Sequence, residues 1–308
     1  MARKAIRKGD GKMLDAHDVL KGFVDLHIHA GPSLMAREMD AWEMAQQAVQ
    51  NGLAAIVIKD HHLPSVGATR IIQEHLKGTD LKVFGSIALN SPVGGLNPKA
   101  VEVAIGFGAK VVWMPTVSCE NHIKKHSGHG VKFPKLRQRL TVPETPIRLT
   151  DDAGKLIPEA ERVIEVMAEH PEVILATGHG DREEIDAIVK GAFRLGVKKI
   201  LIDHPYYMVD ATLDDMKAWS SLGAYIELTA VVSVPSSQFY SVPAETVAGF
   251  IRGLDPDRMV ISSDYGQLGN GSPIEGTYTF VELLRVAGID GKIIRKMLTE
   301  NPSHLLGL

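Results

Sequence analysis

Short apolar runs rich in Val and Ile recur along the whole chain, and each is bounded by polar or glycine-containing segments. Such runs are typical of strands that are buried on both faces of a parallel sheet. They predict eight strands, at residues 23–28, 54–59, 82–88, 110–114, 173–177, 199–202, 224–228 and 259–262.

Segments with helical periodicity fill most of the gaps between these strands. Residues 38–50, 158–170 and 181–195 each carry apolar side chains along one helical face, and Pro158 stands where a helix can begin. Strand and helix alternating eight times predict an α/β fold, a single (β/α)8 TIM barrel. The rival is an open doubly wound sheet. It would show a Gly-rich phosphate turn after the first strand, where this chain has His-Ala-Gly-Pro.

The domain organisation follows from this rhythm and its one interruption. We expect one barrel domain over residues 1–308, with 1–22 as an N-terminal lead-in. The gap after the fourth strand is unusually long, which predicts an inserted lid segment over residues 116–157. Within it, residues 146–157 surround an Asp-Asp-Ala-Gly turn and predict a small hairpin.

The residues at the predicted strand ends are the candidates for chemistry, because active sites of such barrels lie at the C-terminal ends of the strands. The first strand ends in His27 and His29, whose side chains point the same way because strand side chains alternate. His179 follows the fifth strand, His204 the sixth and Asp264 the eighth. Each alone has an ordinary explanation, such as a turn or a helix cap. Together they favour a metal site with an open position, suited to Zn²⁺ or to Mn²⁺, Fe²⁺ or Ni²⁺.

The composition narrows the functional classes. The chain is 44% hydrophobic and 23% charged with a formal net charge of -3, which gives no case for nucleic acid or for an anionic membrane surface. The single cysteine, Cys119, favours a reducing compartment and is expected to be a passive thiol. We expect a cytoplasmic homo-oligomer that acts on a small-molecule substrate.

The strand-end motifs resemble those of the amidohydrolase superfamily, metal-dependent hydrolases on a (β/α)8 barrel. The matching segments are Phe-Val-Asp-Leu-His27-Ile-His29, Thr-Gly-His179, Asp-His204-Pro and Ser-Ser-Asp264, and the closing segment 298–308 is also similar. The resemblance implies that His27, His29, His179 and Asp264 bind the metal. His204 would be a ligand of a second metal or a catalytic hydrogen-bonding residue.

One departure from the superfamily pattern concerns the number of ions. Binuclear members bridge two metals with a carboxylated lysine or a glutamate at the end of the fourth strand, where this chain has Met114-Pro115-Thr116. One ion is therefore favoured. Two remain open, because Lys59, Asp60 or His61 from the second strand could replace the bridge.

The roles implied by the resemblance are those of a hydrolase. Asp264 would be the general acid–base residue and His204 would polarise the scissile carbonyl. Glu227 ends the seventh strand, where a buried carboxylate needs a partner and could belong to the site. The pocket candidates are Arg37, Asn90, Tyr206 and Tyr265.

Several of these pocket candidates have a second explanation. Arg37 could pair with a substrate carboxylate or be a solvated residue on the first turn of a helix, and the tyrosines could pack under loops. The insertion could likewise be a lid over an anionic substrate or a solvated loop. Its basic residues are His122, Lys124, Lys125, His126, His129, Lys132, Lys135, Arg137, Arg139 and Arg148.

The leading functional hypothesis is hydrolysis of a C–N or C–O bond in an amide, cyclic amide, ester or lactone through metal-activated water. Metal-dependent decarboxylation on the same barrel is the alternative within enzymes, and a non-catalytic metal-binding protein is the alternative outside them. Phosphoester cleavage of the TatD type is disfavoured by the missing glutamate and by the mildly negative charge.

Overall fold

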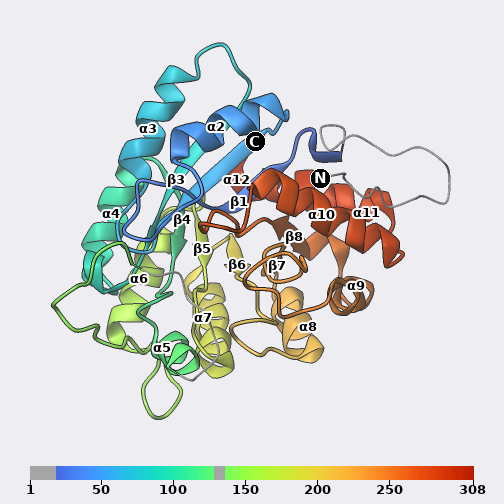
Figure 1. Ribbon diagram of the computed structural model, residues 1–308. Coiled ribbons are helices and arrows are strands. Elements are labelled where there is room, and N and C mark those ends of the chain that lie inside the picture. The colour runs from blue at the N-terminus through green and yellow to red at the C-terminus, as the bar shows by residue number, and fades with distance from the viewer. Residues whose placement is uncertain (1–18, 128–135) are drawn as a thin grey trace, which may run out of the picture.

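The computed structural model describes residues 19–127 and 136–308. Eight parallel strands form one sheet in sequence order, and the helices surround them (Figure 1). The strands are β1 (Val24–His29), β2 (Ala55–Lys59), β3 (Lys82–Ala88), β4 (Ala109–Trp113), β5 (Ile174–Ala176), β6 (Ile200–Ile202), β7 (Tyr225–Thr229) and β8 (Met259–Ser262). All eight predicted strands are confirmed.

The helices follow the strands around the ring. They are α2 (Ala41–Gln50), α3 (Val66–His75), α4 (Pro98–Gly106), α5 (Glu120–His126), α6 (Pro158–Ala168), α7 (Arg182–Leu195), α8 (Leu213–Ser221), α9 (Ala244–Gly253), α10 (Pro273–Val286), α11 (Gly291–Arg295) and α12 (Asn301–Leu306), with the short turns η1 (Ser91–Val93), η2 (Pro256–Arg258) and η3 (Lys296–Glu300). Among the described residues, no helix combines the length and the apolar character that a membrane span requires.

The barrel closes where the end of β8 meets β1. Asp264 N donates to His27 O over 2.8 Å, and His29 N donates to Tyr265 O over 2.8 Å. Figure 1 shows the consequence for the chain as a whole, because the red C-terminal helices lie beside the blue first strand. The predicted (β/α)8 barrel is confirmed by this closure.

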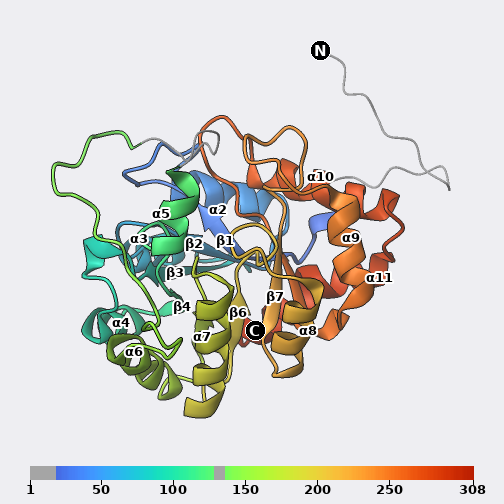
Figure 2. The same cartoon turned by 90° about the horizontal axis from the view of Figure 1, so that it is seen from below.

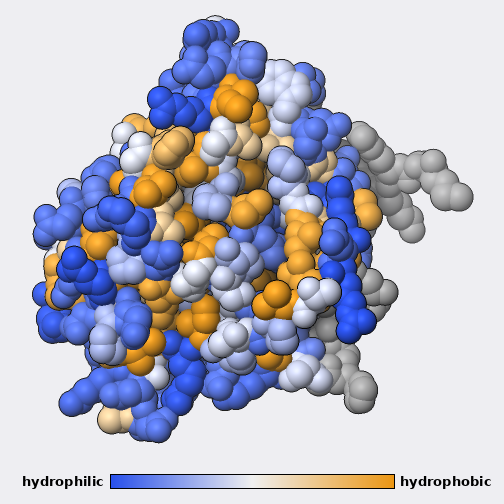
Figure 3. Space-filling model, turned by 90° about the vertical axis from the view of Figure 1, so that its left-hand side faces the viewer, coloured by the Kyte–Doolittle hydropathy of each residue, from blue (hydrophilic) through white to orange (hydrophobic). Residues whose placement is uncertain are grey.

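The core has two layers. Val24, Leu26 and Trp113 belong to a group that fills the barrel interior, and Leu305 and Leu306 of α12 pack against it. A larger group lies between the strands and the helices. On the face covered by α3, α4 and α6, hydrophobic atoms form separate patches among hydrophilic ones (Figure 3). The strands are therefore buried on both faces, as their continuous apolar runs predict.

The insertion after β4 differs from its prediction. Residues 116–127 contain α5, which the sequence did not suggest, and Figure 2 shows α5 at one end of the barrel. The hairpin predicted at 146–157 is not confirmed: Thr150 and Leu156 form one isolated antiparallel bridge around a turn instead of two strands. His129, Lys132 and Lys135 of the insertion, and residues 1–18 of the lead-in, lie outside the described residues.

Candidate metal centre

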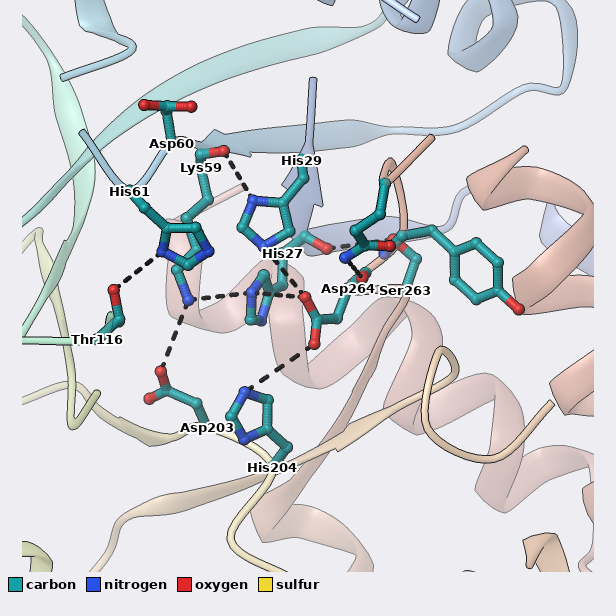
Figure 4. A network of polar contacts seen from close by, with 12 residues as sticks. His27, His29, Lys59, Asp60, His61, Thr116, Asp203, His204, Ser263 and Asp264 are labelled. Carbon is teal, nitrogen blue, oxygen red and sulfur yellow. Dashed lines mark hydrogen bonds and ion pairs between the residues drawn. The ribbon is translucent and has the colours of Figure 1, made fainter. Parts of the chain in front are cut away.

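The end of β1 and the end of β8 bring the first group of donor atoms together. His27 and His29 point into the barrel mouth, while Ile28 between them packs in the outer core. Asp264 adopts a left-handed backbone conformation with φ 52°, which turns its carboxylate toward the two imidazoles. Asp264 Oδ1 lies 3.1 Å from His27 Nε2 and 3.2 Å from His29 Nε2 (Figure 4). Three donor atoms of these residues lie within 4.8 Å of one another.

The ends of β5 and β6 supply a second group of donors. Atoms of His179, Asp203 and His204 also lie within 4.8 Å of one another. Within the part of the chain that the structure describes, His179 Nε2, Asp203 Oδ2 and His204 Nδ1 are buried without a hydrogen-bond partner. His204 Nε2 lies 4.0 Å from Asp264 Oδ2, so the carboxylate of Asp264 faces both groups (Figure 4).

Lys59, at the end of β2, lies between the two groups. Its Nζ is 3.1 Å from His27 Nε2, 3.9 Å from Asp203 Oδ2 and 3.8 Å from the centre of the Trp113 ring. Burial lowers the pKa of Lys59, and the nearby carboxylate of Asp203 opposes that shift. Lys59, predicted as a possible second-metal or pocket residue, thus lines the cavity beside both donor groups.

Three imidazoles of the site, those of His27, His29 and His179, are oriented through their second ring nitrogen. Glu227 Oε2 lies 3.1 Å from His27 Nδ1, and the carbonyl oxygen of Lys59 lies 3.1 Å from His29 Nδ1. His179 Nδ1 is 2.8 Å from the Nδ1 of His122 on α5. Such contacts fix the tautomer and leave Nε2 facing the cavity, as in most protein metal sites.

The charges of the site follow from burial and from the carboxylates. Burial lowers the pKa of His29 to about 3 and that of His204 to about 4, so both rings are neutral at pH 7. Burial alone would also lower the pKa of His27, but Asp264 and Glu227 outweigh it and raise the value to about 9. Burial opposes ionisation of Asp264, yet His27 and His29 hold its pKa well below the ordinary value.

The donors line a cavity at the barrel mouth. Apolar side chains also line it, among them Met208, Val232 and Phe239. A small molecule that entered this space would therefore meet both nitrogen and oxygen donors and hydrocarbon.

Comparison with protein families gives one match that spans most of the chain. Residues 22–227 match the model of a family of unknown function (DUF6282). The chain belongs to this family. The matched region includes His27, His29, His179, His204 and Glu227, whereas Asp264 lies beyond it. No curated protein matches this member of DUF6282.

Solved structures resemble this DUF6282 protein over nearly its whole length. An amidohydrolase from Pseudomonas aeruginosa is 11% identical with a TM-score of 0.61, and covers 95% of this chain and 98% of its own. A β-aspartyl dipeptidase from Fervidobacterium islandicum is 18% identical with a TM-score of 0.60, and covers 94% of this chain and 73% of its own. A 2,6-dihydroxybenzoate decarboxylase is 12% identical with a TM-score of 0.53, covering 93% and 99%. The resemblance to the amidohydrolase superfamily is thereby confirmed in the fold.

Three of the pocket predictions, Asn90, Tyr206 and Tyr265, do not line the cavity in this DUF6282 protein. Asn90 holds loops together, since its side chain bonds to His61 O and to Thr116, and it does not line the cavity. The hydroxyl of Tyr206 accepts the Thr229 N–H. The Tyr265 ring packs so closely on α10 that a Cβ at Gly276 would meet it at 2.3 Å. Packing directs both tyrosines away from the cavity.

Arg37 does line the cavity. It is not a solvated residue of a helix, because α2 begins only at Ala41 and Arg37 is 5% exposed within the cavity wall. His61, predicted as a second-metal or pocket residue, does line the cavity, and its Nδ1 lies 2.9 Å from Thr116 Oγ1. Asp60 remains beside the cavity, 3.8 Å from Arg37.

Sequence reasoning assigned no site role to some residues that line the cavity. His122 appeared only as one basic residue of the insertion, and Gln267, Met208 and Phe239 were not considered. The i, i+4 spacing of His122 and His126 on one helix was the available signal for the first. Nothing in the pattern marked the others, because their positions depend on loops that meet only in the folded chain.

The donor set fits a divalent cation. His179, Asp203 and His204 each bury one polar atom that has no hydrogen-bond partner in the described part of the chain. Such atoms destabilise a protein unless a ligand satisfies them. Imidazole-rich sites with a carboxylate suit Zn²⁺ and neighbouring transition metals.

Proposed function

We propose that this chain is a metal-dependent hydrolase that cleaves a C–N or C–O bond in a small amide, cyclic amide, ester or lactone. The observation that carries the proposal is the meeting of two donor groups at the Asp264 carboxylate, at the floor of a cavity. A site that only stored a metal would have no need of the adjacent apolar wall.

We propose one ion per chain, Zn²⁺ or a similar metal, held by His27, His29 and Asp264 with His179 completing the set. One ion is favoured because the segment after β4, Met114-Pro115-Thr116, offers no lysine or glutamate that could bridge two metals. When bound, a divalent ion supplies Lewis acidity, which makes water acidic near neutral pH and polarises a carbonyl.

The residues of the chain then have distinct roles. Asp264 is ionised, since its pKa is held well below the ordinary value by His27 and His29, and it can take a proton from water and deliver it to the leaving group. His204 is neutral at pH 7 because burial lowers its pKa to about 4. A neutral ring can donate its N–H to the oxygen that becomes negative during attack.

The first experiment is elemental analysis of protein purified without added metal, followed by hydrolysis assays with amide, lactone and ester panels. We expect about one divalent ion per chain. Asp264→Asn should lower kcat/KM by about 10²- to 10⁴-fold, whereas His75→Ala, at an exposed position of α3, should leave it unchanged. Protein that holds no stoichiometric metal even after incubation with Zn²⁺ would refute the proposal.

Decarboxylation is the second candidate, and the likeness to the 2,6-dihydroxybenzoate decarboxylase favours it. The two reactions differ in the fate of water. Hydrolysis in H₂¹⁸O places the label in the product, whereas decarboxylation removes CO₂ from the substrate, puts a proton in its place and leaves a product without the label. Mass spectrometry of the first turnover product distinguishes them.

A further inference from the structure

The proposed function leaves Arg37 in the cavity wall without a task. Its side chain is 1% exposed, and it lines the same cavity as His29 and Asp264. Its charge is felt there, because the guanidinium is the second cause, after burial, that lowers the pKa of His29.

Arg37 lacks the partners that a buried guanidinium needs. Within the described residues, its Nε has no hydrogen-bond partner. Its Nη2 donates weakly to the Met35 sulfur over 3.8 Å and lies 3.8 Å from Asp60 Oδ2, too far for a hydrogen bond. A guanidinium carries five N–H donors, and a buried donor without an acceptor is unfavourable. An acceptor from outside the chain would satisfy them.

Asp60 does not hydrogen-bond to Arg37, although its Oδ2 has no other hydrogen-bond partner among the described residues. Its Oδ1 accepts the backbone N–H groups of His62 and Leu63 over 2.8 and 3.1 Å, which ties the carboxylate to its own loop. The distance between Arg37 and Asp60 therefore reflects two loops that are fixed independently.

The backbone around Arg37 is held rigidly beside the metal centre. Arg37 forms an antiparallel bridge with Gln267 in the loop that carries Asp264. Glu38 N donates to Gly266 O over 2.9 Å, and Gln267 Nε2 donates to Asp264 O over 2.7 Å. A guanidinium fixed in this way is pre-organised to bind a ligand without further ordering of its loop.

The charges around Arg37 favour a carboxylate over a dianion. Arg37 and Lys59 both line the cavity, and the charges that act on Arg37 are those of Asp60, Asp264 and Arg137. A carboxylate needs one guanidinium to pair with, whereas a phosphate dianion beside Arg37 would meet stronger repulsion from the two aspartates. The planar fork of arginine also matches a carboxylate with two parallel hydrogen bonds.

We propose that the substrate is a small carboxylic acid whose carboxylate pairs with Arg37 and whose apolar body lies against Met208, Val232 and Phe239. That this carboxylic acid is a substrate rests on the proposed hydrolase function. The carboxylate site itself does not, because no predicted metal ligand is needed for Arg37 to pair with a carboxylate.

The test is isothermal titration calorimetry with acetate and benzoate, with benzamide as the neutral match of benzoate and inorganic phosphate as the rival anion. Chelator-treated protein is used first, so that no metal can bind the anion. We expect acetate and benzoate to bind, benzamide and phosphate to bind more weakly, and Arg37→Gln to weaken benzoate at least about tenfold. Arg37→Lys keeps the positive charge but loses the planar fork, so its affinity for benzoate should lie between that of the unaltered protein and that of Arg37→Gln. Arg70→Gln, exposed on α3, should match the unaltered protein.

Three outcomes would overturn the inference: no binding of either carboxylate, equal affinity of benzoate for the unaltered protein and for a folded Arg37→Gln, or tighter binding of phosphate than of benzoate. If Arg37→Gln does not fold, Arg37→Lys and the benzoate–benzamide comparison still decide. The two proposals can fail separately. Protein that never holds metal but binds benzoate through Arg37 refutes the hydrolase alone, and a metal-loaded hydrolase without preference for carboxylates refutes only this inference.

Discussion

At the scale of single residues, the pairing of His122 with His179 links the insertion to the metal centre. Both rings are neutral at pH 7, because burial lowers the pKa of each. Their Nδ1 atoms lie 2.8 Å apart, so one of them donates a hydrogen bond to the other. If Nε2 of His179 is to bind a cation, the ring proton of His179 stays on Nδ1, and Nδ1 of His122 accepts the hydrogen bond.

This pairing predicts that His122→Ala weakens metal binding by about 10- to 100-fold, as loss of such supporting contacts does elsewhere. Competition with a chromophoric chelator measures the affinity. His75→Ala serves as the exposed histidine control and should keep the unaltered affinity. Equal affinities for His122→Ala and the control would show that α5 does not orient His179.

Cys119 gives a second prediction at this scale. It is fully buried, and burial together with the Glu184 carboxylate raises the pKa of its thiol far above the ordinary value. Because the thiolate is the reactive form, native protein should resist iodoacetamide at pH 8. Protein unfolded in guanidinium should take up one label per chain, which mass spectrometry detects. Rapid labelling of the native protein would contradict the passive role.

At the scale of elements, the closure between β8 and β1 depends on Gly266. Its φ is 123°, and a Cβ there would lie 1.6 Å from the carbonyl oxygen of His29. Any side chain must therefore separate the two strand ends that carry His29 and Asp264. The glycine is required by the close approach of the two backbones.

Gly266→Ala should lower the free energy of unfolding by about 3 kcal/mol or more, since it combines backbone strain with a steric clash. Urea denaturation measures the change. Gly249→Ala is the matched control, because Gly249 lies within α9 with open space around its Cβ position. That control should stabilise the protein by about 0.5–1 kcal/mol. Similar stability of both variants would mean that the closure tolerates a wider gap.

At the scale of the whole molecule, the site gathers buried charges and unpartnered donors from β1, β2, β5, β6 and β8. These residues reduce the stability of the metal-free barrel, because their desolvation is only partly compensated. A bound ion should therefore stabilise the fold as well as complete the site.

Zn²⁺ at about 100 times its Kd should raise the free energy of unfolding by about 2.7 kcal/mol, because the ion binds the native state preferentially. Thermal unfolding of chelator-treated and metal-loaded protein measures the difference. His29→Ala, which removes one donor, should show a smaller effect of Zn²⁺. Identical unfolding curves with and without metal would contradict a site formed by the folded barrel. Self-association of the chain stays a prediction, which light scattering of the purified protein tests.

Much of the fold was open to prediction from the sequence alone. The eight apolar runs determined the strands, and the residues next to them determined which imidazoles and carboxylates gather at the mouth of a closed barrel. This worked because strand formation and the alternation of side chains are local properties, and because parallel strands bring their C-terminal ends to one side.

Tertiary structure alone decided what the loop residues do. Arg37 and Tyr265 both follow strands, yet packing buries the first in the cavity and turns the second against α10. Lys59 reaches His27, and His122 meets His179, across 32 and 57 residues of chain. The direction of such a side chain is set by partners that are distant in sequence, so no local pattern contains it.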